Sequence, residues 1–239
     1  MAFAKGKVGA YWFASGTPTY LIEMMRKLGV QPTQLGRMEA QASDFDAPTE
    51  TMTTLTPLLY QIGYVTIKGY DDFMQLYTLD IPNHEVELGL MRSLIPYYVM
   101  PDRQKANLTI AFMARALYRG DIDGMLRLLQ AFLGTVPYTD NTRYEGHYQQ
   151  VLFIIFSLLG AWADVEVRTP RDRVDVVLEM NRHLYLLELK VDGTAAEALR
   201  QIGEKRYAVR FALAGRPVTK VGVSFDSKEH NIKDWVVGE

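Results

Sequence analysis

Two acidic residues and a lysine in the last third of the chain have a spacing suited to metal-assisted phosphate chemistry. Asp175 lies in the run 173–180, and Glu188 and Lys190 lie in the run 184–190. Alternating residue character and apolar content predict a strand for each run. Every second residue of a strand shares a face, so we expect Glu188 and Lys190 on one face, with Asp175 on the polar face of its own strand.

The turn between these strands determines their register. A hairpin centred between Asn181 and Arg182 would place Asp175 directly opposite Glu188, with Cβ atoms about 4.5–5.5 Å apart. Carboxylates this close repel each other, unless one is protonated, both splay into water, or a cation lies between them. A divalent cation would relieve the repulsion and activate a water, and Lys190 could hold that water or stabilise phosphate charge. Oxygen ligands favour Mg²⁺ or Mn²⁺.

Two residues on flanking helices fit the same site. Glu145 lies in the first turn of a helix predicted for 144–159, at helical spacing from its apolar face, and is expected to point toward the sheet. Gln201 lies on a helix predicted for 195–213, and its amide could bind a phosphate or a water on the metal. Each residue alone has an ordinary structural interpretation, such as a helix-dipole partner for Glu145. The carboxylates, the lysine and the two helix residues together are a more specific sign of a metal site than any one of these residues alone.

The elements that position these residues follow the order α-β-β-β-α-β in region 138–239, with further strands predicted at 163–169 and 220–225. Region 86–137 is predicted to be helical, with Asp121 as an N-cap. Region 1–85 combines helices with a hairpin, which fits a winged-helix-like module or another small α+β unit.

Composition narrows the class of protein. The 239 residues are 48% hydrophobic and 23% charged, as in a globular protein. The absence of cysteine excludes disulfides, thiolate zinc sites and cysteine nucleophiles. The 28 acidic and 26 basic residues create no global positive field, so nucleic-acid binding would need a local basic face or a metal. The longest apolar run, 151–163, is shorter than the ~20 residues of a membrane span. We expect a cytoplasmic protein without a membrane partner.

The carboxylate and lysine pattern within this element order resembles the PD-(D/E)XK nuclease superfamily. The resemblance implies a restriction-endonuclease-like α/β (α+β) core with Asp175, Glu188 and Lys190 as motif residues. It also implies Mg²⁺ or Mn²⁺ as cofactor, held by both carboxylates, by Glu145 and by the carbonyl of Leu189. Gln201 would be the residue that the second helix of this core contributes to the site.

Shorter stretches resemble bacterial AAA-ATPase-like proteins that end in a nuclease-like domain. The stretches that match the nuclease-like end are 172–175, 186–190, 198–202, 205–207 and 221–225, and those that match the end of the ATPase-like domain are 11–20, 60–67 and 82–86. This resemblance implies an ATPase-like end at 1–85, a helical connector at 86–137 and a nuclease-like domain at 138–239. The sequence has no GxxxxGK[ST] loop, so we expect no P-loop ATP hydrolysis and a C-terminal fragment or natural short form.

Two functions follow as hypotheses. The first is metal-dependent hydrolysis of phosphodiester bonds in nucleic acid, with DNA favoured over RNA. Its phosphate contacts would be Arg173, Lys205, Arg206 and Arg210, with Arg200 as a further candidate. The alternative is a catalytically silent nuclease-fold module that binds or regulates an upstream ATPase-like domain or another protein partner.

Overall fold

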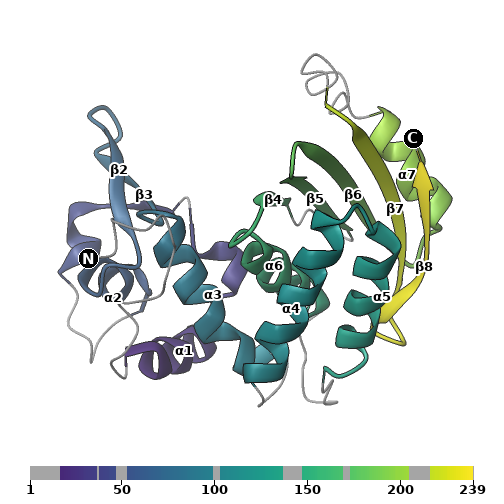
Figure 1. Ribbon diagram of the computed structural model, residues 1–239. Coiled ribbons are helices and arrows are strands. Elements are labelled where there is room, and N and C mark those ends of the chain that lie inside the picture. Colours follow the sequence, from purple (N-terminus) through teal and green to yellow (C-terminus); the bar gives the residue numbers. More distant parts are fainter. Residues whose placement is uncertain are drawn as a thin grey trace. The chain divides into compact units, whose positions relative to one another are not determined.

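A computed structural model describes residues 17–36, 38–46, 53–98, 103–136, 147–168, 173–204 and 216–238 (Figure 1). It has a mixed α+β fold with two separate sheets, which confirms the predicted fold class. The chain divides into two compact units, Met1–Leu94 and Ile95–Glu239. None of the helices within the described ranges combines the length and the apolar character that crossing a membrane requires.

The first unit is a small α+β assembly around a three-stranded antiparallel sheet of order β1-β3-β2. Its elements are α1 (Thr17–Leu28), η2 (Pro32–Gln34), β1 (Met38–Ala40), η3 (Ala42–Phe45), α2 (Thr56–Gln61), β2 (Thr66–Asp71), β3 (Leu76–Asp80) and the start of α3 (His84–Tyr98). Glycines with positive φ, Gly29 and Gly63, follow the first two α-helices, where the left-handed conformation ends a helix. The hairpin prediction is also confirmed. Strand β1 was not predicted, because three residues are too few to show an alternating pattern.

The second unit contains a five-stranded sheet of order β4-β5-β6-β7-β8. Its elements are α4 (Arg103–Tyr118), α5 (Ile122–Leu133), α6 (His147–Leu159), β4 (Asp164–Arg168), β5 (Arg173–Met180), β6 (His183–Val191), α7 (Ala195–Glu204), β7 (Val218–Asp226) and β8 (Asn231–Gly238). Neighbouring strands are antiparallel except β6 and β7, which are parallel and have α7 between them in the sequence.

This arrangement confirms the predicted α-β-β-β-α-β order, and β8 adds an edge strand that was not predicted. The predicted start of α6 at 144 and the predicted end of α7 at 213 lie outside the described residues. The predicted N-cap is confirmed, since Asp121 accepts a hydrogen bond from the backbone N–H of Gly124 at 2.7 Å.

The two faces of the five-stranded sheet are covered by different helices (Figure 1). On one face, the ring of Tyr148 from α6 stacks on Phe225, with centroids 4.6 Å apart. The hydroxyl of Tyr185 on this face donates to the carbonyl of Leu117 in α4 at 3.1 Å. On the other face, Leu186 packs with Ile202 of α7. Glu188 has the same parity as Leu186 along β6, so the predicted site lies on the face covered by α7.

Candidate active site

The turn between β5 and β6 determines which residues of these two strands lie opposite each other in the site. Asn181 and Arg182 have φ values of 51° and 62°, the left-handed conformations that a two-residue type I′ hairpin requires. The resulting register pairs Met180 with His183 and, further along, Asp175 with Glu188. The predicted pairing of the two carboxylates across β5 and β6 is therefore confirmed.

The two carboxylates differ in burial. The Glu188 side chain is 2% exposed, whereas Asp175 is half-buried. Oε1 of Glu188 and Oδ1 of Asp175 are both shielded from solvent. A low-dielectric surrounding strengthens the attraction between such carboxylates and a cation.

Gly222 explains why Glu188 is covered. It is the register partner of Glu188 on β7, and α7 passes directly over it. A Cβ atom built on Gly222 would lie 2.1 Å from the carbonyl oxygen of Ala195 and 2.4 Å from the amide nitrogen of Leu199. The absence of a side chain at this position lets the helix approach the sheet beside Glu188.

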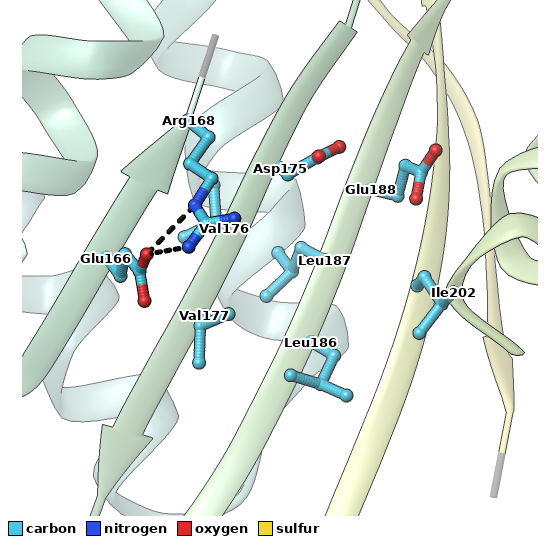
Figure 2. Close-up of a pocket in the computed structure, with 9 residues that line it drawn as sticks. All are labelled: Glu166, Arg168, Asp175, Val176, Val177, Leu186, Leu187, Glu188 and Ile202. Atoms are coloured by element: carbon cyan, nitrogen blue, oxygen red, sulfur yellow. Dashed lines mark hydrogen bonds and ion pairs between the residues drawn. The ribbon is translucent and has the colours of Figure 1, made fainter. Parts of the chain in front are cut away.

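The carboxylate pair opens onto a hollow on the surface of the sheet (Figure 2). The space in the hollow that a water molecule can reach is about 20 Å³, so the hollow is narrow. Its apolar wall includes Val177, Leu186 and Ile202, and its polar lining comes from β4, β5 and β6. The carboxylates therefore lie at a mostly apolar hollow, where the buried Glu188 is shielded from bulk water.

An arginine and a glutamate on β4 belong to this hollow and were missed by the sequence analysis. Arg168 is the register partner of Asp175, so Arg168, Asp175, Glu188 and Gly222 form one row across four strands. The guanidinium of Arg168 donates to Oε1 of Glu166 through Nε at 2.9 Å and Nη2 at 2.5 Å (Figure 2). The alternation in β4 could have shown that these residues share a face, but not which residue of β5 they oppose.

Lys190 points toward the start of α7. Its Nζ lies 3.5 Å from Oε2 of Glu197, and its stem occupies the space above Gly193, where a Cβ would meet Lys190 Cδ at 2.6 Å. Glu197 is held by a capping box, in which it accepts from the N–H of Thr194 and donates its own N–H to the Thr194 hydroxyl. The hydrogen bonds from Thr194, followed by the charge of Lys190, lower the pKa of Glu197.

The other site residues predicted from the sequence lie on α7, on β5 or outside the described residues. Gln201 is half-buried on α7, next to Ile202, and Arg200 is exposed on the same helix. Arg173 pairs with Lys190 in the register of β5 and β6. Glu145, Lys205, Arg206 and Arg210 lie outside the described residues, so their predicted roles stay predictions.

The donor set fits a small divalent cation. Mg²⁺ is commonly bound through one or two carboxylates and keeps several of its waters. Asp175 and Glu188 supply such a pair, while the described ranges contain no cluster of three His, Asp or Glu side chains suited to a metal. The predicted third ligand, Glu145, lies in the part that the structure does not describe.

Comparison with known proteins agrees with this geometry. Residues 143–235 match the sequence model of the PD-(D/E)XK nuclease superfamily. A nuclease-superfamily domain is therefore found in this region, and its sheet fits the restriction-endonuclease-like fold.

The chain is also 29% identical over 246 residues to an "Uncharacterized protein in vnfD 5'region" of Azotobacter chroococcum mcd 1. The match covers 99% of this chain and 48% of the relative, so the chain spans about half of that protein's length. Neither match names an ATPase, and the ATPase-like resemblance stays a prediction.

Proposed function

We propose that the second unit is a metal-dependent nuclease that hydrolyses phosphodiester bonds in nucleic acid. The observation that carries this proposal is the pairing of Asp175 with the buried Glu188, inside a region that matches the nuclease superfamily. Like charges in register destabilise a sheet, and a cation between them would remove this repulsion. A catalytically silent fold would have no such need for both carboxylates.

The proposed roles follow from position. Asp175 and Glu188 hold Mg²⁺ or Mn²⁺, with Glu145 and the Leu189 carbonyl as further ligands. The cation, when bound, polarises the phosphate and lowers the pKa of the attacking water. Lys190 orients that water or offsets charge on the phosphate, and Gln201 assists at the phosphate.

Arg168 extends the proposed phosphate contacts beyond those expected from the sequence. Its place beside Asp175 in the cross-strand row supports a contact with the phosphate next to the scissile bond. Guanidinium groups suit this task, because they stay charged at all ordinary pH values and present several N–H donors to phosphate oxygens. Arg173, Arg200, Lys205, Arg206 and Arg210 are proposed as contacts further along the strand. DNA is the favoured substrate, and an upstream ATPase-like domain is a proposed partner.

A cleavage assay tests this function. The purified chain is incubated with plasmid, single-stranded DNA or RNA, in Mg²⁺, Mn²⁺ or EDTA, beside Asp175→Ala and Lys190→Ala. Glu179→Gln is the matched control, because Glu179 lies on the same face of β5 but forms an ion pair with Arg216.

We expect metal-dependent cleavage by the wild type and the control, and loss of cleavage in both site variants. Equal cleavage by wild type and Asp175→Ala would contradict the proposal. Absence of both cleavage and metal-induced thermal stabilisation would favour the silent binding module.

A further inference from the structure

A second hollow, lined by three arginines among other residues, lies between α4 and α5, on helices that cover the sheet face opposite the carboxylate pair. The space in it that a water molecule can reach is about 420 Å³, and it is open to solvent. Its size is in the range of sites that bind small organic ligands, and it exceeds what an inorganic ion needs. It is lined by Phe112, Arg115, Ala116, Arg119, Asp121, Gly124, Arg127 and Leu128, which we call the arginine groove.

The arginine groove has an excess of positive charge. Arg115, Arg119 and Arg127 face one lining carboxylate, Asp121. Across the described part of the chain, no ion pair neutralises any of these three arginines. Arginines gathered in this way repel each other, and a polyanion in the groove would relieve this repulsion.

The nearby acidic side chains are committed to structural contacts. Asp121 caps α5 through the N–H of Gly124 at 2.7 Å. Asp123 accepts a hydrogen bond from Nε1 of Trp235 on β8 at 2.7 Å. Among the described residues, neither carboxylate is hydrogen-bonded to an arginine of the groove, so these two acids do not neutralise the guanidinium groups by direct contact.

An aromatic ring adds a second kind of recognition. Phe112 is 37% exposed, and the guanidinium carbon of Arg115 lies 4.7 Å from its ring centroid. Bases of single-stranded nucleic acid stack on aromatic rings and on guanidinium planes, while the backbone contacts further cations. The paired bases of a duplex have no exposed faces for such stacking.

We infer that the arginine groove binds single-stranded nucleic acid, with phosphates at Arg119 and Arg127 and a base at the Phe112–Arg115 stack. This binding goes beyond the proposed hydrolysis, since the groove and the carboxylate pair belong to opposite faces of the sheet. A flanking part of a substrate, or a separate strand, would be held there without any metal.

The inference is tested by fluorescence anisotropy with a labelled single-stranded oligonucleotide of about 12 nucleotides. All proteins carry Asp175→Ala and the buffer contains EDTA, so neither cleavage nor metal contributes. Failure of the proposed hydrolysis would therefore leave this measurement unaffected.

The groove variant is Arg119→Ala with Arg127→Ala. Its matched control is Lys228→Ala with Lys233→Ala, which removes two exposed positive charges near β8. We expect the groove variant to bind roughly tenfold or more weakly, with a salt slope shallower by about 1.4, and the control to change little. Phe112→Ala should weaken binding roughly fivefold or more through lost stacking.

Asp121→Asn is a control that separates an effect on the groove from weaker binding caused by misfolding. Asparagine also caps helices well, so α5 should stay intact while the groove loses its carboxylate. We expect tighter binding in this variant. Equal losses in the groove and control variants, no binding by the Asp175→Ala parent, or tighter binding of a duplex of the same sequence would each overturn the inference.

Discussion

Gly222 lies opposite Glu188 in the parallel register of β7 and β6, and the backbone of α7 occupies the space that a side chain on Gly222 would need. The burial of one catalytic candidate thus depends on a residue without a side chain on the next strand. Because the contacting atoms belong to the helix backbone, they have little freedom to move away.

Gly222→Ala is expected to displace α7 and to destabilise the fold by about 1–3 kcal/mol, the usual range for overpacking. Urea denaturation measures this loss. Gly203→Ala on α7 is the control, because nothing lies within 4 Å of its Cβ position and alanine favours helix. Equal stability of the two variants would contradict the close approach of α7 to β7.

Asp175→Asn is expected to raise the thermal unfolding midpoint of the metal-free protein. The change removes repulsion from Glu188, worth about 0.2–1 kcal/mol for directly opposed like charges. Glu179→Gln on the same strand breaks the ion pair with Arg216 and should give no such gain. A lower midpoint for Asp175→Asn, measured by calorimetry in EDTA, would show that the pair is not repulsive.

Gly193→Ala should displace Lys190 without unfolding the protein. The new Cβ would meet Cγ, Cδ and Cε of Lys190 at 2.6–2.9 Å, and this flexible stem can move aside. We expect a cleavage rate roughly ten- to a hundredfold lower, because small displacements of a catalytic group have effects of this size. Unfolding free energy should change by less than about 0.5 kcal/mol. An unaltered rate would remove Lys190 from the proposed mechanism.

The carboxylate pair could be predicted from sequence because a two-residue turn and two alternating strands specify a hairpin register. The position of Arg168 could not be predicted in this way, because the four-residue connection 169–172 contains proline and aspartate but does not specify one register. Strand β8 was missed because Lys233 and Asp234 interrupt its apolar pattern. The ion pair of Lys190 with Glu197 depends on side-chain rotamers, which residue spacing does not determine.

His147 predicts a pH dependence of stability. Burial lowers its pKa from the ordinary value of 6.5, an effect opposed by a hydrogen bond with the Tyr98 backbone and aided by the charge of His230. The unfolded chain therefore takes up a proton first as the pH falls. The stability that depends on neutral His147 is fully present above about pH 6.5 and is lost as the pH falls through the folded-state pKa.

His147→Gln should reduce the difference in unfolding free energy between about pH 7.5 and about pH 5.5. Chemical denaturation at both values measures this difference. His84→Gln is the control, because His84 is exposed. An unchanged difference in His147→Gln would show that another group causes the acid sensitivity.

Asp175 and Glu188 are proposed to hold a divalent cation together, and calorimetric titration with Mn²⁺ measures this binding. We predict saturable binding to the wild type and to Glu179→Gln, with a matching rise in thermal midpoint. Both effects should be absent from Asp175→Ala and from Glu188→Gln. Equal Mn²⁺ affinity in wild type and Asp175→Ala, or no binding to the wild type, would contradict the claim.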